Sequence, residues 1–535
     1  MDSVIYNPQE EYEAKYKNLH IKNTEEFLEE LVKKSAVNVE ENRETVRQYE
    51  NYMENLKKLR RKYNLFRFLR VLMCITIVLI PLVVLKMTPK IRALKIEVDE
   101  ADKNADRLLA EAQKQMAPLN NLFTPWDSLN LVQSTIPLLS FEKQFTVSQE
   151  TDMKINYDFS EYKPNEQSAL EVLSGNYNGN PFLLENKVIH KMGTEDYHGY
   201  KTIYWTEYYK DSNGKRQSRT RSQTLCATVT KPKPFYSTQV VLNYCAQGGP
   251  ELSFSRDATN LDEKSERAIE RYVKSGEKRI QRKAENALSN NSNFMGMTNS
   301  EFEVLFDALD RTDEVQFRTL FTPLAQTNMV DLILSKVGYG DDFNFIKQRR
   351  TNRIISQHSQ GRDIKILPKE YFSYSFDVIK ENFVGKNTEF FKAVYFDFAP
   401  LWAIPMYQER PVHSLKPIPA LKQQYSLKEC EVLANAVEQK HVVHPQTKTQ
   451  AILKSAFVRS ADNADLMCVT AYSYDIAERV DIVSVRGDDG KYHNIPVKWD
   501  DYLPLENKKL FKVTAAENAQ NINVMACRNG LCIYN

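Results

Sequence analysis

The sequence predicts an α+β protein in which N-terminal helices, one transmembrane helix and a helical stalk precede mainly antiparallel-sheet domains with packed helices. Apolar side chains at helical spacing lie on both sides of a central apolar run. That run holds fifteen consecutive uncharged residues between Arg70 and Lys86. From about residue 120 the pattern changes to aromatic and β-branched runs separated by turn sequences, which is typical of strands.

These patterns divide the chain into five regions in linear order. We predict N-terminal helices at 1–64, a transmembrane helix at 65–88, a helical stalk or short coiled coil at 89–117, an α+β domain with hairpins at 118–350 and a C-terminal α+β region at 351–535.

The composition describes a folded chain without an overall charge bias. At 535 residues the chain is too long for one ordinary core. Hydrophobic residues make up 42% and aromatic residues 11%, which argues against disorder. Lys and Arg number 72 against 70 Asp and Glu, so the net charge of +2 gives no general attraction for nucleic acid. We therefore expect no specific nucleic-acid partner.

The cysteines are spread thinly and indicate neither a disulfide scaffold nor a zinc site. Cys527 and Cys532, in "CRNGLC", lack the second pair of ligands that a zinc knuckle needs. We interpret the cysteines as ordinary thiols, with the alternative that a pair oxidises if its domain lies outside the cell. They are Cys74, Cys226, Cys245, Cys430, Cys468, Cys527 and Cys532.

The N-terminal region carries two helical patterns. "NTEEFLEELVKK" begins with Asn23, a good N-cap residue, and places Glu26 three residues later, as in a capping box. A second periodic set continues toward the apolar run and comprises Val46, Tyr49, Met53 and Leu56. We expect a helical hairpin or a partner-binding helix here.

Residues 65–88, "LFRFLRVLMCITIVLIPLVVLKMT", predict a transmembrane helix. The uncharged core alone would span only ~22 Å, but the full segment spans ~36 Å against a hydrocarbon core of ~30 Å. Arg67, Arg70 and Lys86 lie near enough to the ends to snorkel. A cleaved signal peptide is excluded because 64 residues precede the segment. A buried core helix is the remaining alternative, although such helices seldom lack polar residues over four turns.

Flanking cations set the expected orientation, because cation-rich flanks stay in the cytoplasm. Upstream lie seven: Lys57, Lys58, Arg60, Arg61, Lys62, Arg67 and Arg70. Downstream lie five: Lys86, Lys90, Arg92, Lys95 and Lys103. The small difference predicts a single-pass protein of the cell membrane with a cytoplasmic N-terminus and an extracytoplasmic large domain.

The stalk region has the rhythm of a coiled-coil seam over three heptads. Its seam residues are Ile91, Leu94, Val98, Ala101, Ala105, Leu108 and Ala112. A single charged helix that leans on its own domain is the alternative. Pro118 is expected to end the helix.

The 118–350 region begins with a strong hairpin signal at 201–231, where two strand-like runs surround Asn213-Gly214. The returning strand carries a basic strip, interpreted as a solvated edge, with contact to phosphate or anionic lipid as the alternative; the strip is Lys215, Arg216, Arg219 and Arg221. A charged helix is expected at 261–288.

Three further elements and a terminal hairpin complete the prediction. "EFEVLF" and "VQFRTLF" alternate like strands, and Thr322-Pro323 then starts a helix that reaches about Val337. A helix is expected around Ser426 to Gln439. "VDIVSVRGDDGKYHNIPVKW" predicts a hairpin with Asp488, Asp489 and Gly490 at its tip.

Several of these segments resemble a family of bacterial membrane proteins of unknown function, with a subgroup in Gram-positive bacteria and their wall-less relatives. The resemblance rests on "GNYNGNPFLLE", "HGYKTIYWTEYYKD" and, most specifically, "SEFEVLFDALDRTDEVQFRTLFTPLAQ". It covers about residues 90–340 for the general family and nearly the whole chain for the subgroup. It implies a membrane location and no known reaction, so no catalytic residue follows from it. Many members have two membrane segments near the N-terminus, whereas this chain shows one.

Candidate chemical motifs all have simpler explanations. "GYGDDFNF", with Asp341 and Asp342, spells the metal-binding turn of polymerases, but that turn needs strands on both sides and the preceding "MVDLILSKVG" is helical. His441 and His444 have ligand spacing but no second pair of ligands nearby. Arg486-Gly487-Asp488 spells an adhesion tripeptide that a hairpin turn explains without a partner.

The acidic turn formed by Asp307, Asp310, Asp313 and Glu314 is interpreted as a polar loop, with a cation site as the alternative. No nucleophile elbow, phosphate loop or dinucleotide fingerprint is present. We therefore assign no catalytic, cofactor-binding or metal-binding residue.

The leading functional hypothesis is a membrane-anchored, non-enzymatic binding or scaffold component of the cell envelope. Its partners would be the lipid bilayer, through residues 65–88, and a protein partner or a second copy, through helices at 24–60 and 91–112. The alternative is a membrane-bound, hydrolase-like enzyme whose site assembles from distant histidines and acidic partners. The histidines are His190, His198, His441 and His444.

Overall fold

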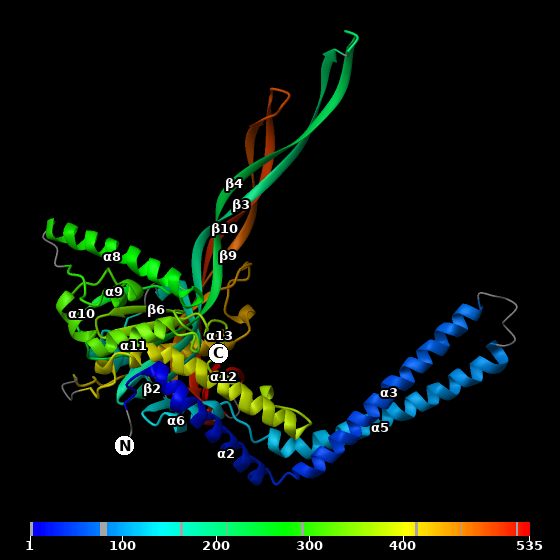
Figure 1. Cartoon of the computed structure of the whole chain (residues 1–535), viewed down its shortest axis with the longest axis horizontal. Helices are drawn as coiled ribbons and strands as arrows, with labels where there is room; N and C mark the ends of the chain where they lie inside the picture. The colour runs from blue at the N-terminus through cyan, green and yellow to red at the C-terminus, as the bar shows by residue number, and fades with distance from the viewer. Residues whose placement is uncertain are drawn as a thin grey trace. The chain divides into compact units, whose positions relative to one another are not determined.

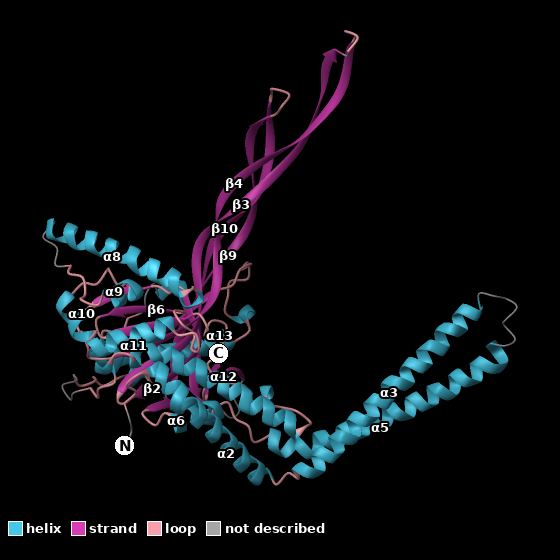
Figure 2. Cartoon of the chain, in the orientation of Figure 1, coloured by secondary structure: helices cyan, strands magenta, loops and turns pink. Residues whose placement is uncertain are grey.

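The chain is an α+β protein with two antiparallel sheets (Figures 1 and 2). The computed structural model describes residues 4–74, 83–160, 164–210, 212–259, 261–289, 294–411, 416–461, 463–519 and 523–535. Two compact units are present. Unit 1 contains Pro8–Leu138 and Lys365–Phe396, and unit 2 contains Leu139–Ile364 and Asp397–Asn535 together with a short N-terminal segment. The units interleave along the chain, whereas the predicted regions follow one another.

Unit 1 is helical. Its elements are α1 (Pro8–Glu11), a π-helical turn η1 (Tyr12–Tyr16), α2 (Lys17–Ser35), α3 (Val39–Cys74), a second π-helical turn η3 (Val83–Met87), α5 (Thr88–Asn120), α6 (Asp127–Thr135) and the part of α12 (Phe376–Trp402) up to Phe396.

Helices α3 and α5 form a long antiparallel hairpin within unit 1 (Figure 1). Three side-chain contacts show that the two helices are antiparallel, because residues later in α3 contact residues earlier in α5. They are the hydrogen bond of Asn42 to Gln115 (3.2 Å), the ion pair of Arg60 with Asp102 (2.7 Å) and the Lys90 ammonium 5.0 Å from the centre of the Phe66 ring. The end of the hairpin therefore coincides with the central apolar run.

The predicted coiled-coil seam faces this same chain. Ile91, Ala105, Leu108 and Ala112 are buried in α5, and Leu56 is buried in the facing helix α3. The heptad spacing is satisfied by α3 of the same chain, which packs antiparallel to α5, so no second copy is needed to cover the seam.

The predicted transmembrane helix has no counterpart among the described residues, where no helix has both the length and the hydropathy of a membrane span. α3 ends at Cys74 and η3 begins at Val83. Residues 75–82, in the middle of the predicted segment, lie outside the described residues. The membrane segment stays a prediction.

Two predicted helix boundaries in unit 1 were wrong. Asn23 is not an N-cap, because α2 continues directly from the π-helical turn η1 and begins at Lys17; the Asn23 amide instead donates to the Thr135 hydroxyl (3.3 Å). Pro118 does not end α5, which continues to Asn120. A proline removes only its own N–H bond, and the Asn121 N–H still donates to the Ala117 carbonyl (3.0 Å).

Unit 2 contains both sheets. The seven-stranded sheet has the order β1-β2-β3-β4-β7-β6-β5, and the five-stranded sheet has the order β11-β12-β10-β9-β8. The strands of the first are β1 (Leu139–Glu142), β2 (Gln167–Tyr177), β3 (Asn180–Lys210), β4 (Arg216–Cys245), β5 (Ser253–Arg256), β6 (Phe343–Gln348) and β7 (Thr351–Ser356). Those of the second are β8 (Ile452–Ala461), β9 (Ala464–Arg486), β10 (Tyr492–Ala515), β11 (Val524–Arg528) and β12 (Leu531–Tyr534).

The two hairpins expected from turn sequences are present, and both are long (Figure 2). Lys210 pairs with Arg216 across the Asn213-Gly214 turn, where Gly214 has φ +76°. The β3–β4 and β9–β10 hairpins pack on each other around a small apolar cluster that includes Ile203 and Val497. The backbones approach so closely that a Cβ at Gly199 would clash with the Pro496 carbonyl oxygen.

The helices of unit 2 cover these sheets and include three predicted elements. They are α7 (Val147–Tyr157), α8 (Glu266–Ser289), α9 (Ser300–Phe306), α10 (Glu314–Leu320), α11 (Pro323–Leu334), α13 (Leu427–Ala436) and the remainder of α12. The expected helices at 261–288, after Thr322 and after Ser426 correspond to α8, α11 and α13. Thr322 caps α11 by accepting from the Ala325 N–H (3.4 Å).

The predicted strands "EFEVLF" and "VQFRTLF" were wrong: they form the short helices α9 and α10. Each helix has an N-cap, Asn299 or Asp313, whose side chain accepts from a backbone N–H in the first turn. The phenylalanines repeat at intervals of four, so one helical face carries them toward the buried Phe254. The apparent alternation came from two short helices, of which α9 is mostly buried and α10 buries Phe317 and Leu320.

Candidate functional site

The first candidate site is the distal end of the α3–α5 hairpin, defined by the apolar side chains of its described residues and called the hairpin tip. Each of these large apolar side chains exposes between 52% and 76% of its surface. They are Leu65, Phe68, Val71, Leu72 and Leu85. Scattered exposed apolar residues are normal, but a contiguous group marks a contact with a partner or a membrane.

The hairpin tip is also cationic at its margin. No Asp or Glu occurs from Leu65 to Ile96, a range that contains six Lys or Arg residues. One of them, Lys90, lies over the Phe66 ring. An exposed apolar end bordered by cations, in a sequence range without acidic residues, matches the chemistry of an anionic lipid surface.

The second candidate site is a cavity of about 690 Å³ on one face of the seven-stranded sheet in unit 2, here called the sheet pocket. Alternate residues of a strand share a face, so β3, β4, β6 and β7 each contribute side chains. The pocket is defined by Lys187, Ile189, Val241, Ile346, Arg353 and Ile355. Its volume lies in the range of small-molecule sites.

A cluster of charged side chains borders the sheet pocket, because Glu185 and Lys187 share one face of β3 and α13 packs on the neighbouring strand β2. Two ion pairs account for four of its members. Glu185 pairs with Lys428 (2.9 Å), and Glu431 pairs with Lys454 (2.6 Å). Burial raises the pKa of the Glu185 carboxyl and lowers that of Lys428 to about 8.

Two cations of the cluster form no direct ion pair among the described residues, although the charge of Glu185 acts on both, and both line the sheet pocket. The Lys187 ammonium makes no hydrogen bond or ion pair with any of them. The almost fully buried Arg353 guanidinium donates only to neutral oxygens, those of Gln348 (2.5 Å) and the Ser160 carbonyl. Burial lowers the pKa of both cations.

The four histidines of the enzyme hypothesis do not assemble into a site. His190 lines the sheet pocket and a smaller cavity of about 240 Å³, and neither cavity contains another of the four. His198 lies on the exposed part of β3, beside the Thr228 hydroxyl (2.9 Å). His441 and His444 lie in a surface turn, where His444 accepts from the Gln446 N–H (3.2 Å).

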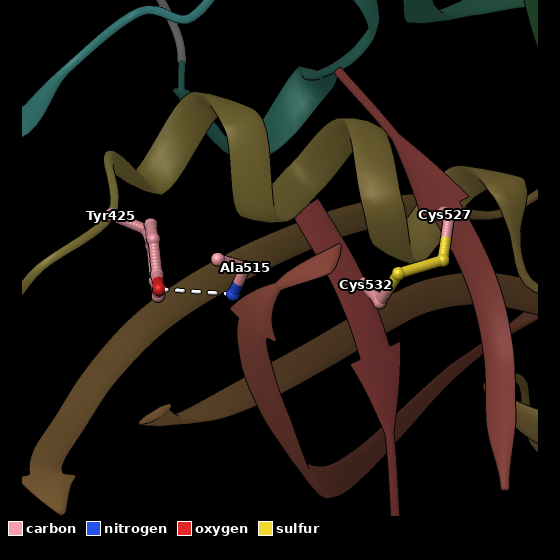
Figure 3. Close-up of a disulfide and its surroundings, with 4 residues drawn as sticks. All are labelled: Tyr425, Ala515, Cys527 and Cys532. Atoms are coloured by element: carbon pink, nitrogen blue, oxygen red, sulfur yellow. Dashed lines mark hydrogen bonds between the residues drawn. A yellow bond between two sulfur atoms is a disulfide. The ribbon is translucent and has the colours of Figure 1, made fainter. Parts of the chain in front are cut away.

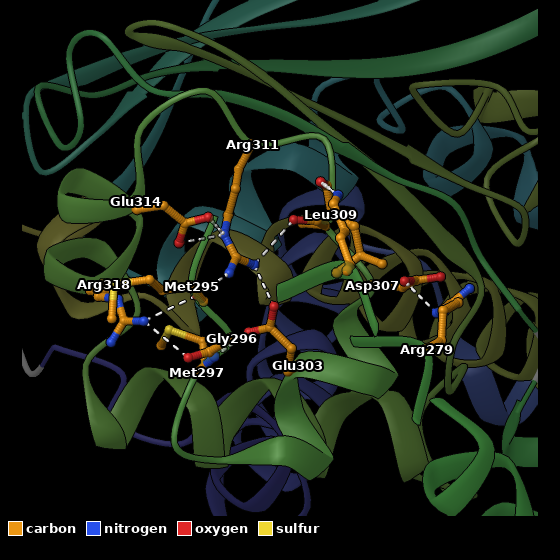
Figure 4. A network of polar contacts seen from close by, with 12 residues as sticks. Arg279, Met295, Gly296, Met297, Glu303, Asp307, Leu309, Arg311, Glu314 and Arg318 are labelled. Carbon is orange, nitrogen blue, oxygen red and sulfur yellow. Dashed lines mark hydrogen bonds and ion pairs between the residues drawn. The ribbon is translucent and has the colours of Figure 1, made fainter. Parts of the chain in front are cut away.

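The acidic turn after α9 is a structural network (Figure 4). Asp307 forms an ion pair with Arg279 (2.7 Å), and Asp313 caps α10. Glu314 binds Arg311, which also forms a buried ion pair with Glu303 (2.6 Å). Asp310 accepts from the Ser255 N–H (2.9 Å). Within the described part of the chain, no group of acidic, histidine or cysteine side chains has the arrangement of a metal site.

The two aspartates of "GYGDDFNF" are likewise structural. Asp341 is buried and forms an ion pair with Arg256, while Asp342 accepts from the His358 N–H (3.1 Å). The two aspartates therefore bind different partners within the loop between α11 and β6. The Asp488 N–H of the adhesion-like tripeptide donates to the Gln223 side chain (2.8 Å), so a contact between hairpins occupies it.

A cluster around His358 was missed in the sequence. His358 lies under the Tyr339 ring, 3.8 Å between ring centres, and its two nitrogens face Asp342 and Asp397. Ser359 donates to Asp397 (2.7 Å) but is wholly buried, so no substrate reaches its hydroxyl. These residues come from distant segments, and no local spacing indicates them.

Cys527 and Cys532 form a disulfide, which corrects the interpretation of all cysteines as free thiols (Figure 3). The two residues are paired directly across β11 and β12. Asn529-Gly530 makes the turn, with φ +48° and +78°. An Asn-Gly turn flanked symmetrically by cysteines was the available signal, because a tight hairpin brings such residues into register.

The β11–β12 hairpin is held beside the α13 segment (Figure 3). There the Tyr425 hydroxyl accepts from the Ala515 N–H (3.0 Å) at the end of β10.

Comparison with models of known protein families, with curated proteins and with solved structures found no match to this chain.

Proposed function

We propose that the chain is a membrane-attached, non-enzymatic binding or scaffold protein of the cell envelope, anchored through residues 65–88. The observation that carries this proposal is the exposed apolar hairpin tip, in a range that holds cations and no acidic residue. Burying such side chains in lipid gains ~1.5–3 kcal/mol for each large one. The basic margin would lie at the level of anionic headgroups.

The α3–α5 packing supports insertion as a hairpin whose two flanks leave the bilayer on the same side. A single-pass helix would separate residues 39–64 from 89–120 by the whole membrane. In unit 1 these ranges instead contact each other along their length, as the Arg60–Asp102 ion pair illustrates. The comparison of seven upstream with five downstream cations then loses its meaning, because both groups lie on one side.

The disulfide supports an extracytoplasmic location for unit 2, since such bonds persist in oxidising compartments. We therefore propose that unit 2 lies outside the cell membrane, and hairpin insertion places unit 1 there with it.

Flotation of the purified chain with lipid vesicles tests the anchor. We expect the chain to float with vesicles that contain anionic lipid. The triple variant Val71→Asp, Leu72→Asp and Leu85→Asp should lose at least ~100-fold in partitioning, because each charge in the hydrocarbon region costs ~2.5–3.5 kcal/mol.

The matched control places the same charges at equally exposed apolar positions of unit 2. Tyr200→Asp, Tyr204→Asp and Ile482→Asp alter side chains that are 66–71% exposed. This variant should float like the unmodified chain. Equal flotation of both variants would overturn the anchor.

A further inference from the structure

The sheet pocket combines an apolar wall with a cationic floor. Ile189, Val241, Ile346 and Ile355 supply branched apolar side chains from four neighbouring strands. A surface of this kind accepts a hydrocarbon or ring structure, while polar groups at one end fix its orientation.

The cationic floor carries more positive than negative charge among the described residues of the cluster. The charge cluster contains four cations and two carboxylates, and both carboxylates are already in ion pairs with Lys428 and Lys454. Lys187 and Arg353 remain, and they are the two that face the cavity. An unpaired buried charge is costly, so a protein that keeps two at a cavity wall gains from a ligand of opposite sign.

Acidic side chains at the pocket margin limit the kind of anion. Glu166 and Asp310 also line the cavity, and Asp310 is fixed by the Ser255 N–H and hydroxyl. They would repel a polyanion that extended beyond the floor. The complementary ligand has one compact anionic group and an apolar body.

We infer that the sheet pocket binds an amphipathic organic anion, with its carboxylate or phosphate at Lys187 and Arg353 and its apolar body along Ile189, Val241, Ile346 and Ile355. Guanidinium and ammonium groups form their strongest hydrogen bonds with such anions. The pocket belongs entirely to unit 2, so this inference goes beyond membrane attachment and does not depend on it.

Isothermal titration calorimetry with decanoate tests the inference. The full chain carrying the three aspartates at the hairpin tip is used, which removes apolar binding at that end. Decanoate should bind, whereas decyltrimethylammonium, with the same tail and the opposite charge, should bind at least ~10-fold more weakly. Equal affinity for the two would overturn the inference.

The variant Lys187→Met separates a ligand-binding role from a structural one. It should weaken decanoate binding at least ~10-fold. Without ligand it should raise the melting temperature, because an unpaired half-buried cation is replaced by an apolar side chain. Lys210→Met, at an exposed position on the same strand, should change neither property. Unchanged affinity in Lys187→Met would contradict the assignment.

Discussion

The buried guanidinium of Arg311 is held by two carboxylates, those of Glu303 and Glu314 (Figure 4). The side chains of Arg311 and Glu303 are each only 1% exposed, and their ion pair measures 2.6 Å. Arg279 and Asp307, nearby in the same network, form an ion pair of similar length at the surface. The two pairs differ mainly in their access to water.

Neutralising Glu303 should therefore cost far more than neutralising Asp307. We expect Glu303→Gln to lower the free energy of unfolding by about 3 kcal/mol, because it leaves a buried guanidinium short of one counterion. Asp307→Asn is the matched control and should cost less than about 1 kcal/mol, since the pair is exposed and asparagine tolerates the positive φ at this position. Urea unfolding measures both. Equal losses would contradict the role of burial.

His20 links the stability of unit 1 to pH. It is buried against the Phe391 ring, with 4.0 Å between ring centres, and its Nε2 donates to the Asn387 carbonyl (3.2 Å). Burial lowers its pKa from 6.5 to about 4. The folded state thus favours neutral His20, and the unfolded chain takes up the proton more readily.

The stability of the folded chain should therefore fall as the pH is lowered. His20 contributes its full stability above pH 6.5, and that contribution is lost as the pH falls through about 4. Between pH 7 and pH 3.5 the unmodified chain should lose ~3 kcal/mol more than His20→Gln. Urea unfolding at the two pH values gives this difference. A loss that is the same with and without His20 would refute it.

At the scale of single elements, capping decides where helix α11 begins. The Thr322 hydroxyl accepts from the Ala325 N–H, and Pro323 occupies the first helical position. Thr322→Ala should lower the free energy of unfolding by ~1 kcal/mol. Thr327→Ala changes an exposed threonine inside the same helix and should stay within about 0.5 kcal/mol. Urea midpoints compare the two, and an equal shift would argue against capping.

Elements with local signals could be predicted. The Asn213-Gly214 and Asp488–Gly490 turns and the Thr322-Pro323 cap each depend on a few adjacent residues, and all three are confirmed. α9 and α10 could not be predicted, because their apolar residues alternate over a short range and only tertiary burial distinguishes a helix from a strand there. The start of α2 also escaped prediction, since it continues an earlier helical turn.

At the scale of the whole molecule, the α+β class was predictable, but the grouping of elements into units was not. Lys187 and Arg353 lie on β3 and β7, with β4 between these strands in the sheet. No sequence spacing relates them. The hairpin of α3 and α5 likewise appears only when the chain folds back on itself, although each helix was expected. Candidate sites built from distant strands therefore had no local signal.

Accessibility of single cysteines in intact cells tests whether the hairpin tip enters the membrane with both flanks on the same side. Replacing Cys74 and Cys468 with serine leaves native Cys226 as the probe after the apolar segment. Replacing Cys226 with serine as well gives the background for the second probe, Lys34→Cys, before that segment. Both positions are exposed. A membrane-impermeant thiol reagent should label both probes without lysis, as hairpin insertion and an extracytoplasmic unit 2 predict. Labelling of Cys226 with protection of the Lys34→Cys probe until detergent is added would show a single crossing and would contradict the account.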